Sequence, residues 1–193
     1  MGHHFHSGKY FLLGLIILCG VIFVDQYTKW LVIETVLRTK PLSAGFLDWF
    51  ITLKKIAFFV NEREHFRTIL LLPVLNVVMV WNQGISFGIL ESNSPRMALV
   101  FIALSLALSL AMFIWLAINT QKVVAIALGL IIGGALGNVM DRVRFNAVAD
   151  FIDFHYQEYH YPAFNVADSC IVIGAGILML SSLLIKEGTK RKK

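Results

Sequence analysis

The stretch "VVAIALGLIIGGALGNVM", residues 123–140, decides the fold because it is long, apolar and without charge. A helix that crosses the hydrocarbon core of a bilayer needs about 20 mostly apolar residues. Similar segments run from Tyr10 to about Ile33, from Met97 to Gln121 and from Ser169 to Ile185. The chain is 58% hydrophobic and only 15% charged. These features predict an all-α membrane protein with a bundle of four transmembrane helices.

Glycines recur within the opening stretch. Gly129, Gly133 and Gly137 follow one another at four-residue intervals. Such small residues let the backbones of neighbouring helices approach closely. We interpret them as packing positions rather than as part of a chemical site. Cys19 and Cys170 also lie in apolar segments, where we expect structural thiols rather than a disulfide.

Basic residues set the predicted orientation. Four spans place both chain ends on one side, and Lys9, Lys122 and the tail "KEGTKRKK" assign that side to the cytoplasm. The net charge of +5 is densest in this tail, where anionic lipid headgroups explain it better than nucleic acid does. We expect one integral membrane domain, 1–193, with cytoplasmic tails 1–9 and 186–193 and outer loops 34–96 and 141–168.

The N-terminal apolar segment has the length and charge order of a secretory signal peptide. No A-x-A-like cleavage site follows it, so we interpret it as an uncleaved anchor. The opening "MGHHFHSG" is interpreted as a disordered cytoplasmic tail rather than as a metal-binding tract or a cloning remnant.

The first outer loop mixes aromatic, apolar and charged residues. Its "FLDWF" and "VVMVW" pieces suggest short extended or interfacial segments, and residues 54–72 suggest an interfacial helix or a lid. A fifth span is disfavoured because Glu62, Arg63 and Glu64 would lie at its centre.

Polar residues near the ends of the spans need a reason, because burying them in lipid is costly. Asp25 and Lys29 are four residues apart on one helix face, which favours a structural ion pair over a direct substrate role. Asn138, Asp141 and Arg142 lie within two turns at the end of the third span and favour a polar site over simple solvation of the helix end.

Two further polar motifs have plain structural interpretations. Asn82 and Gly84 in "WNQGISFG" give a turn signal, and Asn165 and Asp168 in "FNVADS" could form the N-cap region of the fourth helix.

Asp150 and Asp168 lie at opposite ends of the loop that joins the third and fourth spans. Antiparallel packing of those helices would bring both carboxyl groups together. Close carboxylates share one proton, so one can activate water while the other donates to a carbonyl under attack. A metal role for His155 and His160 is disfavoured, and no nucleophilic serine motif or phosphate-binding glycine loop competes. We expect no cofactor.

These motifs together resemble a known family. "DQYTK", "NQGISFG", "GGALGNVMDR", "VADFIDF" and "FNVADS", in this order, are similar to the lipoprotein signal peptidase (signal peptidase II) family. The resemblance implies an aspartic endopeptidase of the bacterial inner membrane that cleaves signal peptides before a diacylglyceryl-modified cysteine. It also implies a small extracytoplasmic β-cradle, contact with membrane phospholipids and inhibition by globomycin.

The resemblance assigns roles to residues. It implies that Asp150 and Asp168 are the catalytic dyad. It further implies substrate-binding positions at Asn82, Asn138, Arg142 and Asn165, and structural support from Asp25, Lys29, Asp141, Gly84 and Gly137. One departure is a longer stretch before "NQGISFG", with the surplus near residues 54–76; it could cover the site or be an inert insertion.

Two other function classes stay open from the residues alone. A small transporter or ion-conducting protein would use intramembrane Asp, Asn and Arg as a path, but such a path should extend along the spans. A purely structural subunit would tolerate neutralisation of Asp150 and Asp168.

Overall fold

The computed structural model describes residues 8–38, 45–51, 66–84 and 95–190. Within these ranges four helices are long and apolar enough to cross a membrane, which confirms the predicted four-helix membrane fold. They are α1, Phe11–Trp30, which continues into a wider π-helical segment, η1, Leu31–Leu37; α4, Pro95–Ile118; α5, Lys122–Phe145; and α6, Val166–Lys190. A short helix, α2, covers Phe46–Ile51.

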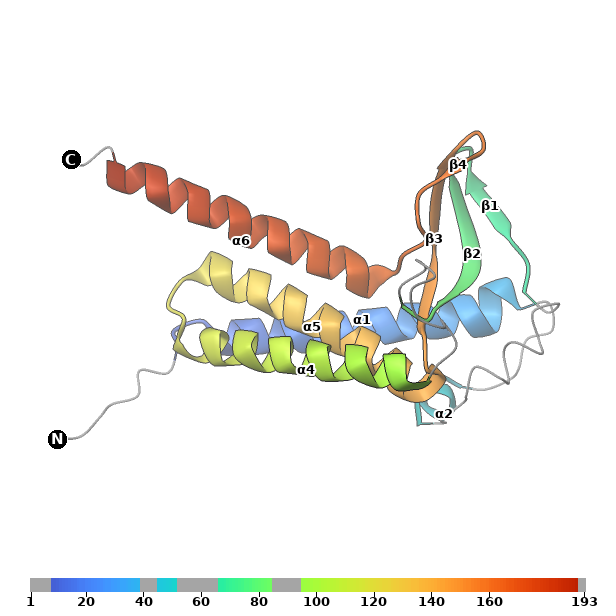
Figure 1. Ribbon diagram of the computed structural model, residues 1–193, viewed down its shortest axis with the longest axis horizontal. Coiled ribbons are helices and arrows are strands. Elements are labelled where there is room, and N and C mark those ends of the chain that lie inside the picture. Colours follow the sequence, from blue (N-terminus) through green and yellow to red (C-terminus); the bar gives the residue numbers. More distant parts are fainter. Residues whose placement is uncertain (1–7, 39–44, 52–65, 85–94, 191–193) are drawn as a thin grey trace.

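Helix α5 is the centre of the bundle and packs against α1, α4 and α6 (Figure 1). Its glycines allow this. A Cβ on Gly129 would lie 2.7 Å from the carbonyl oxygen of Gly14 in α1, and one on Gly133 would lie 2.8 Å from that of Leu18. The interpretation of these glycines as packing positions is confirmed. Most of α5 is buried, whereas α4 and α6 expose most of their apolar side chains, as expected for helices that face lipid.

A four-stranded antiparallel sheet stands across one end of the bundle (Figure 1). Its strands are β1, Ile69–Leu72; β2, Leu75–Asn82; β3, Val148–Tyr156; and β4, Tyr159–His160, in the order β1-β2-β3-β4. Strand β2 pairs with β3 from Leu75↔Phe154 to Asn82↔Val148, with an irregularity between Val77 and Val80. The first turn of α1 and the last turn of α6 lie at the opposite end of the bundle.

The helix ends differ from the predicted spans. Helix α5 ends at Phe145 rather than at Met140, because Asp141 and Arg144 are buried among polar partners and do not need solvent. Asn146 then stops the helix in the left-handed conformation, and its N–H donates to the Arg142 carbonyl. Helix α6 begins at Val166 rather than at Ser169, so Asp168 belongs to its first turn.

The first outer loop matches the prediction in its extended "VVMVW" piece and differs from it elsewhere. The "FLDWF" piece is helical in α2, and "VVMVW" is part of strand β2. The prediction of an interfacial helix or lid over 54–72 is wrong for Ile69–Leu72, which form β1, because pairing with β2 overrides the helix-like apolar spacing. Residues 54–65, like the N-terminal histidines, lie outside the described residues.

Candidate active site

Asp150 lies in β3, where the loop after α5 returns as a strand beside β2. Its side chain is only 1% exposed. The side-chain amide of Asn165 donates to Oδ1 at 2.8 Å, and that of Asn82 donates to Oδ2 at 3.0 Å. Both oxygens of this buried carboxyl therefore accept a hydrogen bond from a neutral amide.

The Asn82 amide is itself oriented. Its Oδ1 accepts a hydrogen bond from the Gly84 N–H at 3.0 Å, which turns its NH₂ group toward Asp150. Gly84 has a φ of 110°, and a Cβ there would collide with the ring of Phe101. Both facts explain why a glycine follows Asn82 so closely.

Asp168 is held in the first turn of α6 by a reciprocal capping arrangement. Asn165 is the N-cap: its Oδ1 accepts from the Asp168 N–H at 2.9 Å, while the Asn165 N–H donates to Asp168 Oδ2 at 3.2 Å. The N-cap interpretation of these residues is confirmed. The remaining Asp168 oxygen, Oδ1, accepts from the Asn138 amide at 2.8 Å.

Asn165 thus joins the two aspartates. Its side chain donates to Asp150 and its backbone N–H donates to Asp168. The residue is completely buried and also donates to Asn138 Oδ1 at 3.2 Å. The structure therefore brings together Asp150, Asp168, Asn82, Asn138 and Asn165, residues that are far apart in the sequence.

The environment changes the acidity of Asp150. Burial raises the pKa of this carboxyl, and the negative charge of Asp168 raises it further, while the Asn82 hydrogen bond, the positive charge of Lys29 and the Asn165 hydrogen bond lower it. The balance gives a pKa of about 7. Asp150 is therefore close to half protonated at neutral pH.

Arg142 lies beside this group without touching the two carboxyls. In the described part of the chain no hydrogen bond or ion pair joins it to Asp150 or Asp168. Its guanidinium lies over the ring of Phe101, 5.2 Å from the centroid, and its Nε is buried with no hydrogen-bond partner among the described residues. Arg142 and Asn138 line a cavity of about 260 Å³ that continues between α4, α5 and α6 past Ser109 and Met112.

A second pair of carboxylates lies next to the first. Lys29 Nζ contacts Asp25 at 2.8 Å and Asp141 at 2.7 Å, and all three side chains are fully buried. The expected ion pair between Asp25 and Lys29 is therefore present, but it is extended by Asp141. Gln26 donates to both carboxylates, at 3.1 Å and 2.9 Å.

This second pair holds the backbone of the first. Asp25 accepts from the N–H of Ala167 at 3.0 Å, and Asp141 accepts from the N–H of Ala149 at 3.1 Å. These alanines directly precede Asp168 and Asp150. A Cβ on Gly137 would lie 2.6 Å from Asp25 Oδ2, so only glycine fits beside this network.

Sequence reasoning missed three residues of this region. Gln26 bridges Asp25 and Asp141; Arg144 donates to Gln26 and to the Trp49 carbonyl; and Phe101 supports Gly84 and Arg142. The first two are adjacent to predicted polar positions and could have been included on the cost of burying polar groups. Phe101 gives no sequence signal, because it is one apolar residue in an apolar span.

The histidines of β3 and β4 form a separate arrangement. The rings of His155 and His160 stack with centroids 5.2 Å apart, and His160 Nδ1 lies 2.9 Å from Asp153. Burial opposes ionisation of Asp153, but hydrogen bonds from Asn76 and His160 hold its pKa below the ordinary value. Among the described residues no group of three or more His, Cys, Asp or Glu side chains is placed to hold a metal ion.

Solved structures resemble this fold. A bacterial membrane enzyme determined by the in meso method at 2.3 Å superposes with a TM-score of 0.67 at 25% identity, covering 98% of this chain and 97% of the other. Another, determined at 1.9 Å, has the same TM-score at 24% identity, covers 93% of this chain and 98% of the other, and supports the fold alone.

Sequence comparisons give the family. The lipoprotein signal peptidase of Pasteurella multocida is 45% identical over 127 residues, which are 65% of this chain and 77% of the relative. That of Burkholderia vietnamiensis is 36% identical over 165 residues, which are 79% of this chain and 97% of the relative. The protein-family model for signal peptidase (SPase) II matches residues 17–184, a segment that contains both pairs of carboxylates. By this match the chain belongs to the signal peptidase II family, the membrane proteases that remove signal peptides from prolipoproteins.

Proposed function

We propose that this chain is an aspartic endopeptidase in which Asp150 and Asp168 are the catalytic dyad. The observation that carries the proposal is the position of Asn165, which donates to Asp150 from its side chain and to Asp168 from its backbone. A single residue can reach both carboxyl groups only if they converge. Neither carboxyl has a cation within hydrogen-bonding distance among the described residues, so a shared proton is the means of lowering their repulsion.

The two aspartates have different roles in the proposed mechanism. Asp150, with a pKa of about 7, supplies the proton at neutral pH, and Asp168 acts as the general base. Asp168 accepts a proton from a water molecule whose oxygen attacks the carbonyl carbon of the scissile peptide. Asp150 donates its proton to the carbonyl oxygen. The tetrahedral intermediate then collapses: Asp168 passes the proton that it took from water to the leaving nitrogen, the C–N bond breaks, and Asp150 recovers a proton from the hydroxyl group that becomes the carbonyl of the new carboxyl end.

Neutral amides and one cation hold the substrate in this proposal. Asn82, Asn138 and Asn165 orient the dyad and offer donors to the peptide backbone. Arg142 supports the same role, because its buried Nε lacks a hydrogen-bond partner in the described part of the chain. The cavity that Arg142 and Asn138 line lies among membrane-spanning helices, where a signal-peptide segment would lie.

The substrate and its location follow from the membrane setting. We infer that cleavage occurs before a diacylglyceryl-modified cysteine, whose acyl chains remain among phospholipids beside the lipid-facing α4 and α6. We assign the chain to the bacterial inner membrane with both termini cytoplasmic and the sheet on the outer side. The first turn of α1 and the last turn of α6 lie at the end away from the sheet, which supports this orientation. Globomycin is the expected inhibitor.

The test uses a purified, diacylglyceryl-modified prolipoprotein and a gel-shift assay of its cleavage. Asp150→Asn and Asp168→Asn should each lower turnover by at least about 10³-fold, because each removes a proton-transfer group. Asp153→Asn is the matched control, since Asp153 lies on the same strand but points to Asn76 and His160. Turnover within a few fold of wild type in either dyad variant would exclude that residue from the dyad.

A further inference from the structure

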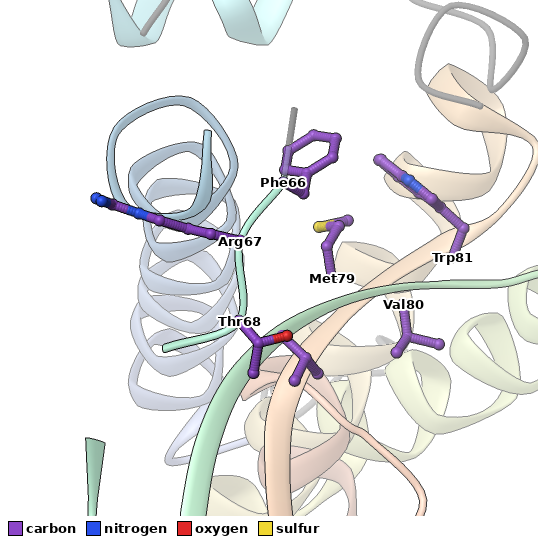
Figure 2. Close-up of a pocket in the computed structure, with 7 residues that line it drawn as sticks. Phe66, Arg67, Thr68, Met79, Val80 and Trp81 are labelled. Atoms are coloured by element: carbon purple, nitrogen blue, oxygen red, sulfur yellow. The ribbon is translucent and has the colours of Figure 1, made fainter. Parts of the chain in front are cut away.

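The sheet has an opening between β2 and the chain that leads into β1. It has a volume of about 450 Å³ and is lined by seven residues: Phe66, Arg67, Thr68, Val78, Met79, Val80 and Trp81. Figure 2 shows the side chains of Phe66, Met79 and Trp81 gathered on one side of it, while Val80 points to the opposite side of β2 and Arg67 points away. Its size is within the range of about 300–1,000 Å³ that is typical of ligand sites.

The opening exists because β1 separates from β2. The two strands pair only from Leu72↔Leu75 to Ile69↔Val77. The chain before Ile69 turns to other partners: Phe66 forms an isolated bridge with Arg38, and the Arg67 N–H donates to the Leu37 carbonyl at 2.9 Å. Strand β3 covers one edge of β2. Within the described residues, the other edge of β2, on the side of β1, therefore has no strand beside it from Val78 to Val80. An open strand edge is a template for an added strand.

This edge lies next to the dyad. Val80 is the direct cross-strand partner of Asp150, so their side chains share one face of the sheet. A strand added at the open edge would lie two strand spacings from β3, which is about 10 Å. An extended peptide covers that distance in about three residues, since each residue spans at most about 3.3–3.6 Å.

We propose that this opening binds the segment of the prolipoprotein that follows the scissile bond, as an added β-strand along Val78–Val80. The inference rests on the proposed function, because it needs a polypeptide cleaved at Asp150. The occupant is a peptide because the open edge offers main-chain donors and acceptors, which an extended chain of almost any sequence can match. The apolar wall of Phe66, Met79 and Trp81 would receive alternate side chains. The contact would begin at about the third residue after the cleavage point.

The experiment compares two lipid-modified precursors with the same signal peptide, one with ten residues after the scissile bond and one with two. N-methylation of the third to fifth amides of the long precursor should raise KM about five- to tenfold, with kcat unchanged, because one or two hydrogen bonds are lost. N-methylation of the eighth to tenth amides is the control. An equal effect at both sets of positions would overturn the proposal.

A variant tests the same site from the enzyme side. Thr68→Trp should fill the opening and raise KM for the long precursor to that of the short one, without changing kinetics on the short precursor. Leu70→Trp is the matched control, because Leu70 is 65% exposed on β1 and does not line the opening. An equal rise in KM for both precursors would contradict binding of the segment after the scissile bond.

The test of peptide binding at the opening gives a result that is independent of the test of the catalytic dyad. The binding proposal is decided by the ratio of KM for the long and short precursors in a catalytically intact chain. Failure of the dyad would instead appear as retained turnover of both precursors in Asp150→Asn or Asp168→Asn.

Discussion

Two carboxylate pairs lie side by side at the sheet end of the bundle, and they differ in the group that joins them. Asp25 and Asp141 share the ammonium group of Lys29, whereas Asp150 and Asp168 share the neutral amides of Asn165. The ammonium group of Lys29 contacts both carboxylates of the first pair and offsets one of their two negative charges. Neutral donors do not cancel the repulsion, so burial and the second charge raise the pKa of Asp150 to about 7.

In the proposed mechanism this difference lets one chain use aspartate both for support and for chemistry. The lysine-joined pair fixes Ala149 and Ala167, the residues just before the two aspartates of the amide-joined pair. Rigid placement of reacting groups lowers the barrier of a reaction. In the proposed mechanism the lysine-joined pair gives rigid support, while the amide-joined pair, which no cation bridges in the described residues, keeps a proton that it can transfer.

The largest expected effect comes from removing the shared cation. Lys29→Met leaves two buried carboxylates without compensation and should lower the free energy of unfolding by about 3–5 kcal/mol. Thermal unfolding in detergent measures this. Lys122→Met, at an exposed lysine at the start of α5, should have little effect. Equal stability of the two variants would mean that Lys29 does not neutralise the pair.

A smaller effect should follow from crowding the lysine-joined pair. Gly137→Ala puts a methyl group 2.6 Å from Asp25 Oδ2 and should destabilise by about 1–3 kcal/mol. Gly20→Ala is the matched control, because nothing lies within 4 Å of a Cβ there, and it should stabilise α1 by roughly 0.5–1 kcal/mol. Unfolding temperatures that change in the same direction for both variants would argue against a closed network around Asp25.

The smallest expected effect concerns the amide-joined pair and is a shift in pH. Activity that needs protonated Asp150 should fall as the pH rises through about 7. Asn82 donates to the Asp150 carboxylate and lowers its pKa, so Asn82→Ala should raise that pKa and move the alkaline limb of kcat/KM upward by about one unit. Asn76→Ala, on the same strand but bonded to Asp153, should leave the limb in place. A downward shift for Asn82→Ala would contradict the proton assignment.

Local sequence features predicted much of the fold and part of the arrangement of the two carboxylate pairs. Hydropathy located the four spans, helical spacing placed Asp25 with Lys29, and chain connectivity brought Asp150 toward Asp168. The features that stayed hidden depend on distant partners. Asp141 joins Lys29 across two helices, and no local pattern indicates which of Asn138, Asp141 and Arg142 belongs to which pair. The residues of β1 have helix-like apolar spacing, but they form a strand because pairing with β2 outweighs that local pattern.

The central claim is that Asp150 holds a proton near neutral pH because amides rather than a cation join it to Asp168. Infrared difference spectroscopy of the purified chain, titrated from pH 5 to 9, measures the C=O stretch of protonated carboxyl groups directly. The account predicts a band that disappears with a midpoint near pH 7 in the wild type and is missing in Asp150→Asn. A spectrum without such a band above pH 5, or with the same band in Asp150→Asn, would contradict it.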